Sequence, residues 1–146
     1  MAMLTVNCPE SPEEFEVYYD LRWRVLREPW GQPRGSEKDE FDPVADHVSV
    51  RDQDGKLIGI GRLHLNNDQE AQIRYMATEE DVRGFGTGRV IITRLEAIAK
   101  ERGVHRITLN ARENIVGFYE HLGYRVTGEG PTMFHEIRHS KMKKEL

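Results

Sequence analysis

The sequence predicts a mixed α/β fold in which helices flank a central, mostly antiparallel sheet of about six to seven strands. Two segments carry apolar residues at helical spacing, three strand-like segments follow one another between them, and the second helix stands between two strands. The 146 residues are enough for one domain with a core and too few for two. We therefore expect a single domain over residues 1–146.

The first helix is predicted to begin at Ser11, after a short apolar strand at residues 4–6. Ser11-Pro12-Glu13-Glu14 combines an N-cap serine, a proline at the first helical position and a capping-box glutamate. Apolar residues then recur at helical spacing until Pro29, namely Phe15, Tyr18, Leu21 and Val25. Residues 33–43 are mostly polar and charged, so we expect a solvated surface loop there.

Three strands are expected next, at residues 45–51, 56–65 and 70–78. Asp54-Gly55 separates the first two, and Asn66-Asn67-Asp68 separates the second from the third. Short turns of this kind join antiparallel neighbours. The middle of the chain therefore predicts an antiparallel meander.

A second helix is predicted after the glycine cluster that ends at Gly88. The apolar stripe of this helix consists of Val90, Ile91, Leu95, Ile98 and Ala99. The helix should end at a turn with basic residues, followed by the glycine Gly103. A strand at residues 105–110 and a short helix at 115–122 should follow. The last strands are expected at 124–127 and 134–142.

Composition narrows the classes of function. The formal net charge of −4 gives no global attraction for phosphate backbones, so nucleic-acid binding is not expected. The single cysteine, Cys8, cannot form an internal disulfide, and no Cys/His spacing suggests a metal site. The sequence contains neither a signal peptide nor an apolar run of about 20 residues, so we expect a cytoplasmic protein without a membrane partner.

The segment Arg83-Gly84-Phe85-Gly86-Thr87-Gly88 is the strongest chemical signal. Alternate glycines let a backbone approach a ligand closely, and the start of the following helix offers unpaired N–H groups to an anion. Arg83 and Arg89 add positive charge. The loop lacks the Gly-Lys-Ser/Thr of nucleotide hydrolases and the third glycine of dinucleotide-binding proteins. A turn that merely joins strand to helix is the alternative.

Together with a second motif, this loop resembles the GNAT superfamily of acyl-coenzyme A dependent N-acyltransferases. Arg83, Gly86 and Gly88 fill the family signature Gln/Arg-x-x-Gly-x-Gly/Ala. Residues 76–78 resemble the strand end that precedes it, and residues 114–124 resemble the family segment Asn-x-x-Ala-x-x-Phe-Tyr-Glu-Lys-x-Gly-Phe. The resemblance covers most of the chain from about residue 45 onward, and it implies a GNAT-type sheet whose strands splay at the cofactor site.

The resemblance also implies roles in binding acetyl-CoA as a cosubstrate, without a metal. The strand end at Met76, Ala77 and Thr78 should pair with the pantetheine arm through its backbone. Asn114 should hydrogen-bond the cofactor, and Phe118 should also belong to the cofactor site. Tyr119 should act as the general acid that protonates the leaving thiolate. The pyrophosphate should be held by the loop N–H groups of Arg83, Gly84, Phe85, Gly86, Thr87 and Gly88.

The general base is left open between His64 and Glu70. His64 ends a predicted strand and imidazole suits proton abstraction, while Glu70 lies on the next strand, where the family often keeps an acidic base. His64 as a structural residue, Glu70 as a turn cap, and water as the base are the alternatives. Arg62, Arg74 and His47 are expected to face the acceptor, which suggests an amine that also carries a carboxylate or phosphate.

The resulting prediction is an N-acetyltransferase that moves an acetyl group directly from acetyl-CoA to a primary amine of a small molecule or peptide. A non-catalytic acyl-CoA sensor, or a degenerate family member, is the first alternative. A small interaction protein whose glycine loop is only a turn is the second. A monomer and a homodimer are both compatible with the sequence.

Overall fold

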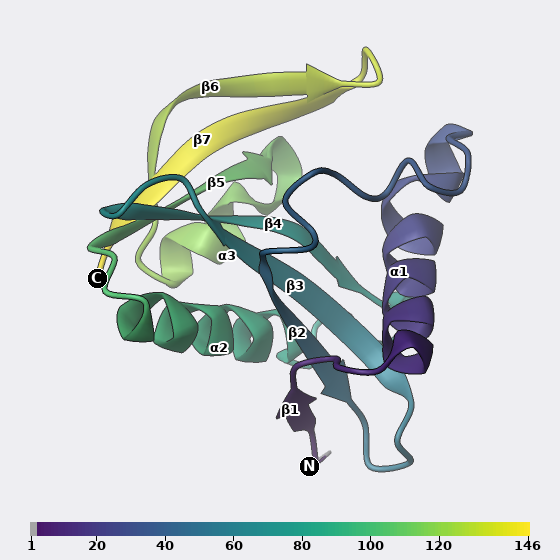
Figure 1. The fold of residues 1–146 in the computed structure, drawn as a ribbon. Helices are drawn as coiled ribbons and strands as arrows, with labels where there is room; N and C mark the ends of the chain where they lie inside the picture. Colours follow the sequence, from purple (N-terminus) through teal and green to yellow (C-terminus); the bar gives the residue numbers. More distant parts are fainter. Residues whose placement is uncertain (1–2) are drawn as a thin grey trace.

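A seven-stranded sheet with the order β1-β2-β3-β4-β5-β7-β6 organises the chain (Figure 1). The structure is a computed structural model and describes residues 3–146. All neighbouring strands are antiparallel except the parallel pair β4 and β5. This confirms the predicted mixed, mostly antiparallel sheet. The elements are β1 (Thr5–Asn7), α1 (Pro12–Leu26), η1 (Glu28–Trp30), β2 (Asp46–Arg51), β3 (Leu57–Leu65), β4 (Glu70–Thr78), η2 (Glu80–Val82), α2 (Thr87–Glu101), β5 (Arg106–Arg112), η3 (Glu113–Ile115), α3 (Val116–His121), β6 (Arg125–Met133) and β7 (Ile137–Glu145).

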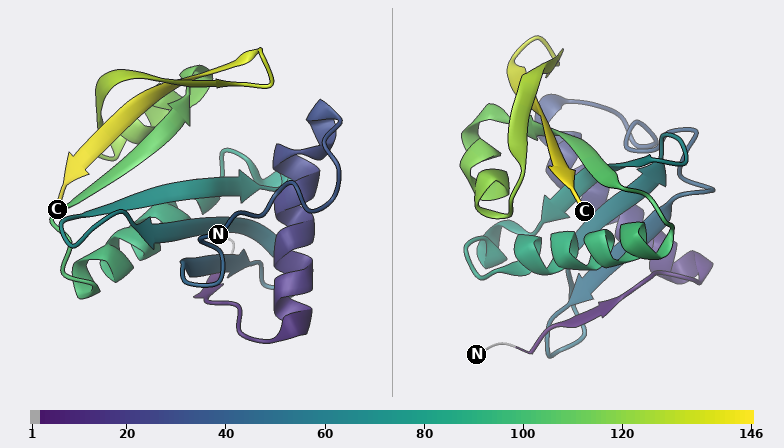
Figure 2. Two further views of the ribbon diagram at one scale, coloured as in Figure 1. Left: turned by 45° about the horizontal axis from the view of Figure 1, so that its top comes forward. Right: turned by 90° about the vertical axis from the view of Figure 1, so that its left-hand side faces the viewer.

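The two long helices pack on different faces of the sheet (Figure 2). The predicted capping box is present at the start of α1: the N–H of Glu14 donates to Ser11 Oγ at 3.1 Å, and the N–H of Ser11 donates to Glu14 Oε1 at 3.2 Å. Tyr18 and Leu21 of α1 form one core cluster with Leu57, Ile60 and Ala77. The stripe of α2 forms the larger cluster together with residues of β2 to β5 and β7, through Ile91, Ile92, Leu95 and Ala99.

A bulge in β4 changes which side chains face which helix. Ile60 of β3 pairs with Ala77 but Arg62 pairs with Arg74, so Tyr75 and Met76 together face the single residue Gly61. Tyr75 takes a left-handed backbone conformation with φ of 58°. A side chain at Gly61 would come within 2.5 Å of Ile91 and 2.8 Å of Met76, so only glycine fits opposite the bulge.

The parallel pairing of β4 and β5 stops halfway along both strands. Glu70–Ile73 pair with Arg106–Leu109, but no ladder joins the following residues of β4 to β5. β5 continues to pair with β7 as far as Arg112 and His139. The sheet therefore opens between residues 74–78 and 110–112 (Figure 1), and one edge of the carboxyl end of β4 is left unpaired.

Three details differ from the sequence prediction. β6 is longer than the expected 124–127, and β7 is displaced from the expected 134–142 by three residues. β6 is an exposed edge strand with register shifts, and it contains glycines and a proline, so it carries no alternating apolar pattern that a sequence could reveal. A 3-10 turn also precedes α3. None of the helices in residues 3–146 is long and apolar enough to cross a membrane.

Candidate functional site

A cavity of about 690 Å³ lies beside the opened end of β4. It is bounded by residues 76–78 of β4, by the glycine loop with the start of α2, and by η3 and α3. Its wall contains all the residues that the sequence predicted for cofactor binding except Phe85, whose side chain is 77% exposed. The lining residues include Arg83 and Arg89 but no aspartate or glutamate, so the cavity suits an anionic ligand.

The glycine loop lines this cavity at the start of α2, although the N–H groups of Arg83 and Phe85 already donate to carbonyl oxygens of the same segment, both at 3.3 Å. Gly84 and Gly86 have φ of 90° and 87°, which a residue with a side chain adopts only under strain. Gly86 is the N-cap of α2, and no side chain caps the helix or adds negative charge to its first turn. The free N–H groups and the positive end of the helix dipole are therefore available to a ligand such as a phosphate.

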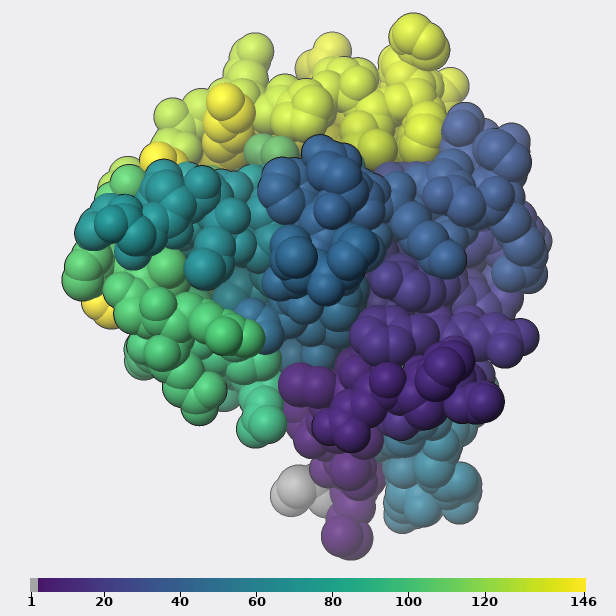
Figure 3. Space-filling view, in the orientation of Figure 1, coloured from purple at the N-terminus to yellow at the C-terminus, as the bar shows by residue number. Residues whose placement is uncertain are grey.

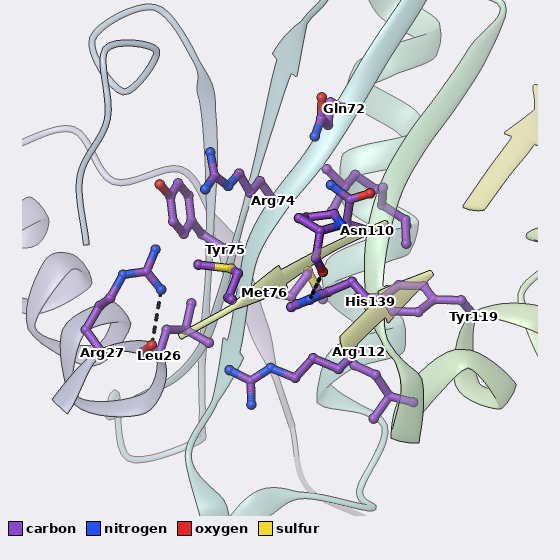
Figure 4. Close-up of a pocket in the computed structure, with 15 residues that line it drawn as sticks. Leu26, Arg27, Gln72, Arg74, Tyr75, Met76, Asn110, Arg112, Tyr119 and His139 are labelled. Carbon is purple, nitrogen blue, oxygen red and sulfur yellow. Dashed lines mark hydrogen bonds between the residues drawn. The ribbon is translucent and has the colours of Figure 1, made fainter. Parts of the chain in front are cut away.

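A second cavity of about 290 Å³ shares Met76, Ile115 and Tyr119 with the first one. Figure 4 shows the residues that line this second cavity. Its residues come from the end of α1, from β4 and β5, from η3 and α3, and from the β6–β7 hairpin. They include Arg27, Gln72, Arg74, Tyr75, Asn110, Arg112, Pro131, Met133 and His139. The three shared residues place the two cavities next to each other.

Tyr119 stands at this junction. Its residue is 4% exposed, and its ring packs edge-on against Phe118 and Tyr124. Burial raises the pKa of the Tyr119 hydroxyl well above its usual value of about 10. The hydroxyl is therefore protonated at neutral pH and can donate a proton or a hydrogen bond.

His139 brings an imidazole to the smaller cavity. Its Nδ1 lies 3.0 Å from the carbonyl oxygens of Pro131 and Ile137. Carbonyl oxygens only accept hydrogen bonds, so Nδ1 carries the proton and Nε2 of the neutral ring has a free lone pair. Figure 4 shows His139 between Asn110 and Tyr119. Gly130 lies directly against His139: a side chain at position 130 would come within 3.1 Å of His139 Cβ.

The two residues predicted as general bases lie away from both cavities. His64 is buried, stacks on Phe41 with ring centroids 4.4 Å apart, and accepts a hydrogen bond from Arg62 at 3.0 Å. Burial and the Arg62 charge lower the pKa of His64. Glu70 is at the opposite end of β4 from the bulge, where it contacts Arg106 at 2.9 Å and Lys143 at 3.5 Å.

Of the three residues predicted to face the acceptor, only Arg74 lines the smaller cavity. Arg62 is fully buried and contacts Asp39 at 2.5 Å and Asp42 at 3.1 Å. His47 is buried between the Tyr18 hydroxyl, at 2.8 Å, and the carbonyl oxygen of Asp42, at 2.9 Å. The strand pattern placed them on the correct strands, but these side chains belong to an internal network.

That network fastens the segment between η1 and β2 to the sheet, so the expectation of a solvated loop is wrong for its carboxylates. Asp42 also contacts Arg22 of α1 at 2.9 Å, and Asp39 contacts Arg74 at 3.3 Å. The Arg22 guanidinium lies 4.2 Å from the ring centroid of Tyr75, the bulge residue. Figure 3 shows this segment lying across the middle of the molecule, between α1 and the β6–β7 hairpin.

Sequence reasoning missed five polar residues of the smaller cavity: Arg27, Gln72, Asn110, Arg112 and His139. Arg27 follows the last turn of α1, Gln72 lies in β4, Asn110 and Arg112 lie in β5, and His139 lies in β7, whose bounds were misplaced. No spacing rule links these positions. In residues 3–146, no group of three or more histidine, cysteine, aspartate or glutamate side chains is arranged to hold a metal ion.

Comparison with known proteins identifies the family. The model of the acetyltransferase (GNAT) family matches residues 15–124. A Bacillus subtilis (strain 168) protein named as a candidate acetyltransferase is 30% identical over 138 residues, which cover 92% of each chain. YitI, an uncharacterized N-acetyltransferase of the same organism, is 30% identical over 120 residues, covering 78% of this chain and 80% of its own.

Solved structures agree with the fold. The crystal structure of a candidate N-acetyltransferase from Lactobacillus plantarum has a TM-score of 0.85 and 28% identity, and the match covers 98% of each chain. An aminoglycoside 6'-N-acetyltransferase complexed with coenzyme A has a TM-score of 0.79 at 18% identity, covering 98% of this chain and 96% of its own, and supports the fold alone. This chain belongs to the GNAT acetyltransferase family.

Proposed function

We propose that this protein is an N-acetyltransferase that moves an acetyl group from acetyl-CoA directly to a primary amine of a small molecule. The observation that carries the proposal is that two cavities share Tyr119 in their walls, one of them holding the glycine loop at the start of α2 and the other holding polar side chains. A direct transfer needs the donor and the acceptor side by side with a proton donor between them. Membership of the GNAT acetyltransferase family supports the choice of donor.

The larger cavity fits acetyl-CoA in two ways. The unpaired edge of β4 at Met76–Thr78 offers N–H and C=O groups to an extended pantetheine arm, as a strand would. The loop of Gly84, Gly86 and Gly88 offers N–H groups to the pyrophosphate, with Arg83 and Arg89 beside it. Asn114 lines the same cavity and can hydrogen-bond the arm. When bound, acetyl-CoA supplies a thioester whose C–S bond breaks as the amine nitrogen bonds to the acetyl carbon.

His139 and Tyr119 handle the protons of this exchange. His139 Nε2 accepts the proton that the amine nitrogen loses, and its Nδ1 proton is held by the carbonyls of Pro131 and Ile137. Tyr119 donates its proton to the leaving sulfur. Solvent then moves the proton from His139 back to Tyr119, so the products are the N-acetylated amine and free coenzyme A. We assign the base to His139 because His64 and Glu70 are engaged with arginines outside both cavities.

Two assays separate this proposal from its alternatives. Thermal unfolding with acetyl-CoA tests donor binding, and release of free thiol over a panel of amines tests transfer. We expect a higher unfolding temperature and amine-dependent thiol release. A raised unfolding temperature without thiol release would indicate a non-catalytic acyl-CoA sensor. An unchanged unfolding temperature would mean that acetyl-CoA does not bind and that the glycine loop is only a turn, which would overturn the proposal.

A further inference from the structure

Two arginines in the smaller cavity have no carboxylate partner. Arg27 is only 8% exposed, and it donates from Nε to the Ser36 carbonyl and from Nη1 to the Leu26 carbonyl, both at 3.1 Å. Arg112 is half-buried at the end of β5. Neither takes part in any salt bridge formed within residues 3–146. The Arg27 guanidinium also lies 5.7 and 5.5 Å from the centroids of two aromatic rings, but neither these rings nor the carbonyl oxygens carry a negative charge.

The protein neutralises its other buried arginines. Arg22 and Arg62 are fully buried, and both contact Asp42, at 2.9 and 3.1 Å. Burying a charge without a partner opposes folding, so stability does not explain why this cavity retains two such charges. Ligand binding does explain it. Burial lowers the pKa of both Arg27 and Arg112, which is the direction expected for cations that lack a counter-ion.

The charge of this cavity is one-sided. Arg74 also lines it, and its single acidic partner, Asp39 at 3.3 Å, lies outside the wall. None of the lining residues is an aspartate or a glutamate. Arg27 comes from the end of α1 and Arg112 from the end of β5, so the fold brings the two guanidinium groups to one cavity from distant parts of the chain (Figure 4).

We propose that the acceptor amine carries an anionic group, a carboxylate or a phosphate, and that Arg27 and Arg112 bind this group. Guanidinium groups offer paired donors that match both anions. An anion held by Arg27 and Arg112 leaves the rest of the molecule inside the cavity that His139 lines and that ends at Tyr119. The inference rests on the proposed function, because it names the class of acceptor for the same site.

The decisive experiment compares acidic amines with neutral amines of the same length. Glycine, β-alanine and γ-aminobutyrate are each paired with the alkylamine that lacks the carboxylate, and O-phosphoethanolamine is paired with ethanolamine. We expect kcat/KM from thiol release to favour at least one acidic member by about tenfold or more, as hydrogen bonds to a charged group allow. A preference for the amino acids would identify a carboxylate as the bound group, and a preference for O-phosphoethanolamine would identify a phosphate.

Substitutions locate the preference. Arg27→Gln and Arg112→Gln should each lower kcat/KM for the acidic amine by about tenfold and change the neutral amine less than about threefold. Arg27→Lys keeps the charge and should retain part of the preference. Arg125→Gln is the matched control, because Arg125 is exposed on β6 and lines neither cavity. Circular dichroism and the coenzyme A dissociation constant verify that each variant is folded and binds its donor.

A binding measurement keeps this inference separate from the proposed function. Butyrate and inorganic phosphate, which cannot be acetylated, are titrated into the protein by calorimetry in the presence of coenzyme A. Anion binding that Arg27→Gln and Arg112→Gln abolish would support the inference even if no amine released thiol. The inference is overturned if acidic and neutral amines react equally, or if neither anion binds. Arg83, which lines the larger cavity, also lowers the pKa of Arg112, so Arg112 could instead serve the donor. The inference is therefore also overturned if Arg112→Gln weakens coenzyme A binding and leaves the preference for acidic amines intact.

Discussion

The two cavities that meet at Tyr119 are built in different ways. In the larger one, the proposed anion site is formed by backbone, namely a continuous glycine loop, the start of one helix and an unpaired strand edge, while side chains of η3 and α3 complete the wall. The smaller one is made of side chains from α1, β4, β5 and the β6–β7 hairpin. A backbone site tolerates most changes of side chain and depends on conformation, whereas a side-chain site depends on each residue that lines it. The following experiments test this difference.

The largest effect is expected at the junction. Tyr119→Phe removes the proposed proton donor, so kcat should fall by about 10²–10⁴-fold with little change in coenzyme A affinity. Steady-state kinetics and a coenzyme A titration measure both quantities. Tyr124→Phe is the control: it loses the hydrogen bond of its hydroxyl to Glu96, at 2.8 Å, but lines neither cavity. Equal kcat values in Tyr119→Phe and the wild type would remove Tyr119 from the mechanism.

The next effect concerns the buried ion-pair network beside the smaller cavity and its contribution to stability. Asp42→Ala leaves Arg22 and Arg62 buried with fewer partners, which should lower the free energy of unfolding by about 3–5 kcal/mol. Urea unfolding measures the change. Asp20→Ala is the control, because its contacts with Arg24 and Arg34 are solvent-exposed and should be worth at most about 1 kcal/mol. A loss of less than about 1 kcal/mol for Asp42→Ala would show that the network does not hold the segment.

The same carboxylate predicts a pH dependence of stability. Burial alone would raise the pKa of Asp42, but Arg22, the N–H of Asp39 and Arg62 outweigh burial, so the pKa is lowered below the reference value of 3.8. A carboxylate whose pKa is lowered by folding contributes stability above its unfolded pKa and loses that contribution as pH falls toward the folded pKa. Wild-type stability should thus decline below about pH 4, and Asp42→Ala should flatten this decline. Parallel pH profiles of the two proteins would contradict this assignment.

A smaller effect is expected on the acceptor side itself. His139→Gln removes the proposed base but can keep a donor toward the hairpin carbonyls, so kcat/KM should fall by about 10²-fold. His64→Gln is the matched control, since His64 lines neither cavity. If His64→Gln loses activity while His139→Gln keeps it, the base returns to the strand histidine.

The smallest effect tests the backbone site. Gly86→Ala forces a residue with a side chain to adopt φ of 87°, which costs about 1–3 kcal/mol and should weaken acetyl-CoA binding by about tenfold. Phe85→Ala changes only an exposed side chain in the same loop, so the dissociation constant should move by less than about threefold. Calorimetric titration measures both. A larger loss in Phe85→Ala than in Gly86→Ala would mean that the loop binds through side chains.

The sequence by itself determined most of the elements and the motif of the proposed donor site. The capping box fixed the start of α1, turn residues separated β2, β3 and β4, and the loop from Arg83 to Gly88 indicated an anion site at a helix start. These features are local: the residues that cause them are neighbours in the chain, so their spacing can be read without a fold. Only the first part of the edge strand β6 was predicted, at 124–127, because the strand buries nothing on a regular period.

Only the tertiary structure decided the smaller cavity, which is the proposed acceptor side. His64 and Arg62 were placed on the correct strand, yet the segment with Asp39 and Asp42 covers that region and turns their side chains into an internal network. The bulge at Tyr75 and the opening between β4 and β5 bring Arg27, Arg112 and His139 to one cavity, although more than 100 residues separate the first from the last. Contacts between such distant residues depend on packing and strand divergence, which leave no periodic trace in the sequence.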